Sequence, residues 1–145
     1  MSVAMATPPL TRQPRLVVDT DVVSYVFKWH PKFAPAYVDL IRGSELVVSF
    51  MTVAEMRQGS LEARWGQGRR NQLELYLSEF GILHSDGALC SIWAEIRRQR
   101  SQLGRPIGGA DAWIAATAIL LAAPLVTNNA KDFAHLKQLE VRTIA

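Results

Sequence analysis

The sequence has little of what stabilises secreted scaffolds, because Cys90 is its single cysteine among 145 residues. One thiol cannot form an intrachain disulfide, so a disulfide scaffold is excluded and a reducing cytoplasm is the expected compartment. We expect Cys90 to be a small buried hydrophobic residue. A basic region followed by an apolar core is also missing from the N-terminus, which argues against a secretory signal.

Long apolar runs are absent too. The longest, residues 112–126, is interrupted by Pro124 and is shorter than the roughly 20 residues that a membrane-spanning helix needs. No membrane anchor is therefore expected. Residues 1–14 contain three prolines and are predicted to be a flexible N-terminal tail. Residues 15–145 are enough for one domain, and an apolar content of 49% supports a buried core.

The remaining residues alternate between strand and helix patterns. Five short apolar runs predict strands at residues 15–19, 45–50, 81–84, 125–127 and 141–144. Apolar residues at helical spacing predict helices at residues 20–28, 31–42, from Met51 to a break at 64–68, and at 69–80, 86–103, 110–122 and 131–139. This alternation indicates an α/β fold with a parallel sheet and helices on both of its faces.

Acidic and amide side chains follow several of these strands or begin the next helix. Asp19 and Asp21 follow the first strand, Glu55 and Asp111 lie near helix starts, and Asn129 follows the fourth strand. Each has a structural alternative: an aspartate or asparagine can cap a helix, Thr52 to Glu55 fits a capping box, and Asp111 suits the helix dipole.

Together these residues favour a metal site. Asp111 begins an almost wholly apolar helix, where a lone carboxylate would be costly unless a cation or donors compensate it. The carboxyl ends of parallel strands meet at one edge, so several carboxylates are expected there. Such oxygen ligands indicate Mg²⁺, with Mn²⁺ as a substitute, and hydrolysis of a phosphodiester.

Four segments resemble, in order and spacing, the sequence blocks of PIN-domain ribonucleases, and above all the VapC-type toxins of type II toxin–antitoxin systems. They are residues 16–24, 52–59, 107–116 and 125–133. The resemblance implies a three-layer α/β/α fold with a five-stranded parallel sheet in the order 3-2-1-4-5. It also implies a magnesium-dependent endoribonuclease that cleaves tRNA or another structured RNA. A cognate VapB-type antitoxin would inhibit it. The expected assembly is a homodimer or a toxin–antitoxin hetero-oligomer.

By position, the resemblance makes Asp19, Glu55 and Asp111 the three catalytic, metal-binding acids. Asn129 occupies a fourth catalytic position at which many members have an acid. The supporting shell would consist of Asp21, Thr127 and Asp132.

The basic residues suggest a polyanionic partner. If four acids gather in one pocket, the other 9 face 16 lysines and arginines, so the remaining surface is basic. The candidates for contact with RNA phosphates are Arg97, Arg98, Arg100 and Arg105; the alternative is an ordinary solvated helix face.

Two alternative functions remain open. Because Asn129 replaces an acid, the chain could be a catalytically degenerate PIN scaffold that binds RNA or a protein partner. Asp19-Thr20-Asp21 also looks like the opening motif of haloacid-dehalogenase phosphatases, in which Asp19 would be the nucleophile. The late paired acids that such enzymes need are not evident.

Overall fold

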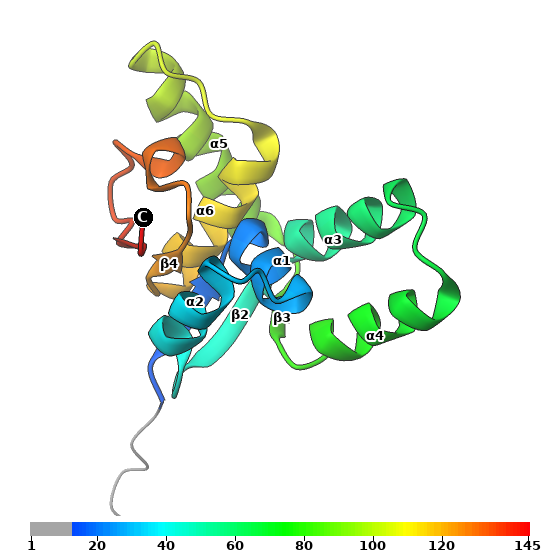
Figure 1. Ribbon diagram of the computed structural model, residues 1–145. Coiled ribbons are helices and arrows are strands. Elements are labelled where there is room, and N and C mark those ends of the chain that lie inside the picture. Colours follow the sequence, from blue (N-terminus) through cyan, green and yellow to red (C-terminus); the bar gives the residue numbers. More distant parts are fainter. Residues whose placement is uncertain (1–12) are drawn as a thin grey trace, which may run out of the picture.

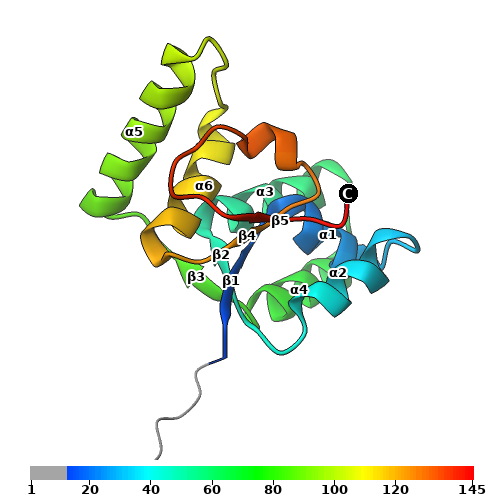
Figure 2. The same cartoon turned by 90° about the vertical axis from the view of Figure 1, so that its left-hand side faces the viewer.

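A computed structural model describes residues 13–145. Except for residues 13 and 14, the predicted tail at residues 1–14 therefore lies outside the described residues. Five parallel strands form one sheet in the order β3-β2-β1-β4-β5 (Figures 1 and 2). Their bounds are β1 Arg15–Val18, β2 Glu45–Ser49, β3 Gly81–Leu83, β4 Leu125–Val126 and β5 Val141–Arg142. The predicted strand order is confirmed.

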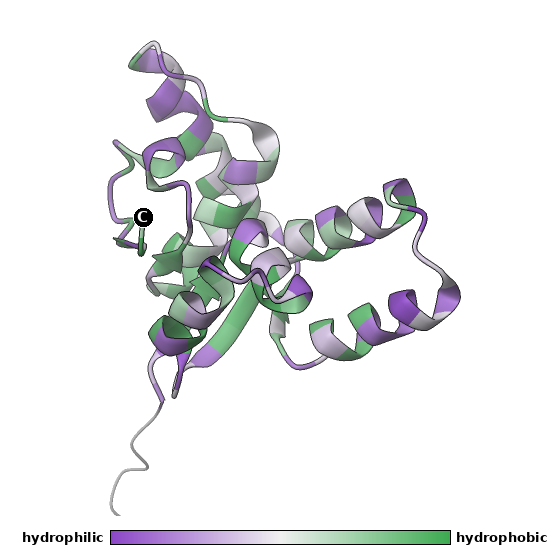
Figure 3. Cartoon of the chain, in the orientation of Figure 1, coloured by the Kyte–Doolittle hydropathy of each residue, from purple (hydrophilic) through white to green (hydrophobic). Residues whose placement is uncertain are grey.

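Helices cover both faces of the sheet. One face carries α1 (Thr20–Lys28), α2 (Phe33–Ile41), α3 (Phe50–Glu62) and α4 (Gln67–Leu77), whereas α5 (Gly87–Gln102) and α6 (Gly109–Leu121) lie on the other. Figure 2 shows the strands between these two groups, and Figure 3 shows the apolar strands at the centre. The three-layer α/β/α fold is confirmed.

Alternation along the strands produces these two cores. In β1, Leu16 and Val18 pack with α1 to α4, while Val17 packs with α5 and α6. All three side chains are at most 1% exposed, as expected for a strand buried on both faces. The three-residue apolar run of β1 thus anchors both layers.

The central position of β1 creates a switch point in the sheet. The chain runs from β1 to β2 and β3 on one side, and β4 and β5 lie on the other. In open α/β sheets, ligands bind outside the carboxyl ends of the strands at such a reversal. Asp19 follows β1 and Thr127 follows β4, so both lie at this point.

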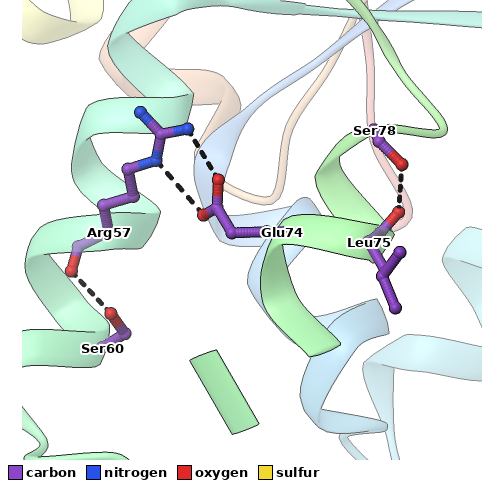
Figure 4. Close-up of polar contacts among 5 residues, drawn as sticks. All are labelled: Arg57, Ser60, Glu74, Leu75 and Ser78. Atoms are coloured by element: carbon purple, nitrogen blue, oxygen red, sulfur yellow. Dashed lines mark hydrogen bonds and ion pairs between the residues drawn. The ribbon is translucent and has the colours of Figure 1, made fainter. Parts of the chain in front are cut away.

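Helices α3 and α4 extend side by side away from the sheet (Figure 1). A two-bond ion pair joins them: Arg57 Nη2 donates to Glu74 Oε1 (2.6 Å) and Arg57 Nε to Oε2 (3.2 Å) (Figure 4). Figure 4 also shows Ser60 and Ser78 donating to carbonyls of their own helices. Because both charged side chains are about half exposed, this pair fixes geometry more than it stabilises the fold.

Several predicted details were wrong. The predicted helix at residues 131–139 is a short 3₁₀ turn, Ala130–Phe133, because His135 and Gln138 adopt positive φ angles of 61° and 65°, which end a helix. Cys90 is exposed: its neighbour Leu89 takes the buried position on α5, and one residue further turns the side chain about 100° towards solvent.

The start of α3 also differs from its prediction. Ser49 is the N-cap, with its hydroxyl accepting from the Met51 N–H at 3.0 Å. The predicted capping box from Thr52 to Glu55 is therefore wrong, and both side chains are free for other contacts. No helix among residues 13–145 is long and apolar enough to cross a membrane.

Candidate active site

Asp19 occupies the switch point and is only 6% exposed. Its Oδ1 accepts a hydrogen bond from the Thr20 N–H at 2.8 Å, which makes it the N-cap of α1. Its Oδ2 accepts from the Thr127 hydroxyl at 2.6 Å, which ties the end of β1 to the end of β4. The capping alternative for Asp19 is thus correct, but it accounts for only one of the two oxygens.

Asp21 connects α1 with the loop after β4. Its Oδ1 accepts from the Val22 N–H at 2.7 Å. Its Oδ2 accepts from the Asn128 N–H at 3.1 Å and from Asn129 Nδ2 at 3.2 Å. The structure therefore brings Asn129 to the acidic cluster as a donor to Asp21, and the Asn129 N–H also donates to the Thr127 hydroxyl at 3.0 Å.

Glu55 reaches the cluster from α3 through a threonine that the sequence analysis overlooked. The Thr20 hydroxyl donates to Glu55 Oε1 at 2.7 Å and lies 2.9 Å from the hydroxyl of Thr52, which is fully buried. Thr20 thus links the first acidic segment to the second. The signal for it was its place between Asp19 and Asp21, in the same turn.

Asp111 lies in the first turn of α6 and is half-buried. Burial raises its pKa, and the charges of Asp132, Glu55 and Asp21 raise it further. Asp111 therefore lies within electrostatic range of the acidic cluster. Asp132, in the 3₁₀ turn, is exposed and acts on Asp111 and Asp21 through its charge.

Burial and repulsion shift the titration of Asp19, Asp21 and Asp111. Burial, followed by the charge of Asp21, raises the pKa of Asp19 to about 8, against the lowering effect of the Thr127 and Thr20 hydrogen bonds. Burial also raises the pKa of Asp21. The three aspartates therefore hold negative charge at a cost that a nearby cation would reduce.

The donors at this site fit a hard divalent cation better than a soft one, because they are carboxylates and hydroxyls with no thiol or imidazole among them. Among residues 13–145, however, no group of three or more acidic, histidine or cysteine side chains is arranged to hold a metal ion. Hydrogen bonds within the cluster occupy both oxygens of Asp19 and of Asp21. The assignment of Asp19, Glu55 and Asp111 as ligands stays a prediction.

The arginines predicted to bind RNA have different roles. Arg100 is only 7% exposed, and its guanidinium donates to the carbonyls of Arg105 (2.7 Å), Asp132 (2.9 Å) and Ala134 (3.2 Å). Its assignment as an RNA contact was wrong, because it instead fastens the Asp132 turn to the end of α5.

The other three arginines are more accessible. Arg97 donates to the Ile107 carbonyl at 2.6 Å and lies over Trp93, so it supports the loop before α6. Arg98 forms an exposed pair with Glu95, and Arg105 lies 3.1 Å from His135 Nε2. Contact of Arg97, Arg98 and Arg105 with RNA stays a prediction.

Comparisons with known proteins agree with this geometry. The PIN domain family model matches residues 16–139. The chain is 30% identical over 125 residues to Ribonuclease VapC1 of Haemophilus influenzae (strain R2866), covering 86% of this chain and 93% of that protein. It is 25% identical over 119 residues to the tRNA(fMet)-specific endonuclease VapC of Shigella flexneri, covering 82% and 89%.

Solved structures are similar over nearly the whole chain. VapBC2 from Rickettsia felis, bound to a promoter DNA fragment, matches with a TM-score of 0.79 and 25% identity, covering 90% of this chain and 99% of that one. VapBC-1 from nontypeable Haemophilus influenzae matches with a TM-score of 0.75 and 29% identity, covering 89% and 97%.

Proposed function

Since the chain belongs to the PIN-domain family, we propose that it is an endoribonuclease that hydrolyses RNA phosphodiester bonds with Mg²⁺, or Mn²⁺ as a substitute. The observation that carries this proposal is Asp19, a buried carboxylate at the switch point whose neighbours Asp21 and Asp111 are also acidic. Family membership leaves no support for the phosphatase alternative.

Each acidic residue has a proposed role. Asp19 and Asp111 would hold the metal directly, and Glu55 would either bind it through water or orient the attacking water. Bound Mg²⁺ supplies an activated water and neutralises charge on the phosphoryl group. The Thr20 hydroxyl fixes the direction of the Glu55 carboxylate. Hydrolysis leaves a 5′-phosphate and a 3′-hydroxyl.

The surrounding polar groups keep the acids in place. Thr127 holds Asp19, while Asn129 holds Asp21 and Thr127 together. Such contacts orient ligands and tune their basicity. Asn129 therefore acts as a neutral donor in the position at which related enzymes often have an acid, and Asp132 adds negative charge from outside.

The substrate and partner follow from relatives. The Shigella flexneri relative is named for tRNA(fMet), and the similar solved structures are VapBC complexes. We infer that this chain cleaves tRNA or another structured RNA. A VapB-type antitoxin inhibits the chain. The chain forms a homodimer or a toxin–antitoxin hetero-oligomer. Residues 15–145 form the nuclease domain, and the cytoplasm is its proposed place of action.

The test is RNA cleavage by the purified chain with Mg²⁺ or with EDTA. We expect cleavage only with Mg²⁺, and a loss of at least about 100-fold in Asp19→Asn and Asp111→Asn, since each removes charge stabilisation in the transition state. Asp39→Asn is the matched control, because Asp39 is an exposed acid paired with Arg42. Circular dichroism checks that each variant is folded.

The outcomes separate the candidate functions. Cleavage in EDTA, or by Asp19→Asn at the wild-type rate, would overturn the proposed roles. RNA binding without cleavage in Mg²⁺ would indicate the degenerate scaffold, for which Asn129 is the motivating residue. Mapping the cut sites on total RNA identifies the substrate.

A further inference from the structure

A cavity of ≈310 Å³ lies between α1 and α3, directly beside the acidic cluster. Thr20, Asp21 and Glu55 line one end of it. Its volume is within the range of about 300–1,000 Å³ that is typical of small-ligand pockets. A molecule that fills this cavity therefore lies against Glu55, which is proposed to act in hydrolysis, and against Thr20 and Asp21 of the same cluster.

The other end of the cavity is aromatic and basic. Trp65 lines it and packs against Phe27, with ring centroids 5.6 Å apart. The guanidinium of Arg69 lies 4.0 Å above the Trp65 ring, and Lys28 Nζ lies 5.9 Å from it. Within the described part of the chain neither cation forms an ion pair, so both are available to an anionic ligand.

An apolar wall with an open position joins the two ends. Met56 contributes its side chain to the wall and is 6% exposed. One turn later on α3, Gly59 has no side chain, and a Cβ at that position would meet nothing within 4 Å. The absence of a side chain at Gly59 keeps this part of the cavity open.

We propose that this cavity binds the base of the nucleotide next to the scissile phosphate, and so selects the site of cleavage. The proposal rests on the proposed ribonuclease function. Proteins hold single-stranded RNA by packing bases on aromatic or apolar side chains and neutralising phosphates with lysine or arginine. Met56 and Trp65 supply apolar surface for the base, and Lys28, which lines the cavity, supplies the cation; Arg69, which lies on the Trp65 ring, adds positive charge nearby.

The order of these groups favours RNA over a peptide. In this arrangement the acids would hold the metal that meets the scissile phosphate, the apolar wall would take the adjoining base, and Lys28 would take the following phosphate. A peptide partner would have to match acids at one end and unpaired cations at the other.

The test fills the cavity with Gly59→Leu and compares it with Gly68→Leu. Gly68 is also a helical glycine with nothing within 4 Å of an added Cβ, but it does not line this cavity. The probes are fluorescent single-stranded RNA oligonucleotides that differ only in the base next to the cut. Binding is measured by anisotropy in EDTA, and cut sites are mapped in Mg²⁺.

We expect Gly59→Leu to bind the preferred oligonucleotide about tenfold more weakly, as for the loss of one base contact. Its preference among bases should flatten, whereas Gly68→Leu should behave as the wild type. Lys28→Met should reduce the slope of log affinity against log salt by about one, as for one lost phosphate contact. Thermal unfolding confirms that the variants are folded.

Unchanged affinity and unchanged cut sites in Gly59→Leu would overturn the proposal. So would normal RNA binding combined with weaker binding of a VapB-type antitoxin, which would assign the cavity to the protein partner. Binding is measured in EDTA, so it does not depend on cleavage. If the chain binds RNA but never cleaves it, the proposed nuclease function is wrong, and the binding data still test whether the cavity holds a base. A chain that does neither rejects both.

Discussion

The buried carboxylate of Asp19 should make the stability of the protein fall as the pH rises when no divalent metal is present. Burial and the charge of Asp21 raise the pKa of Asp19 from its ordinary value of 3.8 to about 8. A raised pKa means that the folded state favours the protonated form of Asp19. The stability that protonated Asp19 contributes is therefore complete below pH 3.8, decreases as the pH rises, and is lost above about 8.

The size of the effect follows from the shift. One pKa unit is worth about 1.4 kcal/mol, and the unfolded acid is already ionised at pH 5 whereas the folded acid is half ionised at pH 8, so the free energy of unfolding should fall by about 3.6 kcal/mol between these pH values. For a chain of this length, that corresponds to a decrease of about 7–14 °C in Tm. If Mg²⁺ binds the ionised carboxylate as proposed, it should raise Tm more at pH 8 than at pH 5.

Differential scanning fluorimetry in EDTA and in Mg²⁺, at several pH values, measures this effect. Asp19→Asn is the informative variant, because asparagine can still cap α1 and contact Thr127 but does not titrate. In EDTA it should be more stable than the wild type at pH 8, with a flatter pH profile, and it should respond less to Mg²⁺. Asp39→Asn should follow the wild type.

A wild-type Tm in EDTA that is constant or rises between pH 5 and pH 8 would contradict the raised pKa of Asp19. The same pH dependence in Asp19→Asn as in the wild type would show that another group causes it. An equal Mg²⁺ effect at both pH values would mean that the ion binds elsewhere.

Three further predictions concern the scaffold. Arg100→Leu should lower the free energy of unfolding by about 2–4 kcal/mol, because three backbone carbonyls lose their donor. The control Arg98→Leu should change it by less than about 0.5 kcal/mol. Equal effects of the two substitutions in urea unfolding would contradict the structural role of Arg100. Ser49→Ala should lower the free energy of unfolding by about 1 kcal/mol through loss of the α3 cap, and an unchanged urea midpoint would contradict that cap. A double-mutant cycle of Arg57→Ala and Glu74→Ala should give a coupling free energy of less than about 1 kcal/mol, which decreases in high salt. A larger coupling free energy that resists salt would show that the packing of α3 against α4 depends on this ion pair.

Three errors of sequence interpretation share one cause. Arg100, Thr52 and Cys90 lie on helices whose positions relative to the sheet set their roles, and helical periodicity gives only an approximate direction for each side chain. Arg100 resembled its exposed neighbour Arg98, yet it points to the carbonyls of the Asp132 turn. The Thr52 hydroxyl resembled a cap, yet it faces Thr20 from another segment. Cys90 looked apolar enough to be buried, but Leu89 fills that place.

The sequence by itself determined the alternation of strands and helices, the parallel sheet and the set of acidic residues, because apolar periodicity and the residues that follow each strand are local properties. Its resemblance to PIN-domain ribonucleases supplied the strand order. Only the tertiary structure decided that Thr127 holds Asp19 across 108 positions, that Thr20 holds Glu55, and that a cavity continues from these acids to Trp65. Hydrogen bonds, burial and the pKa shifts that follow from it depend on distances between segments far apart in the chain, and the packing of helices on the sheet sets those distances.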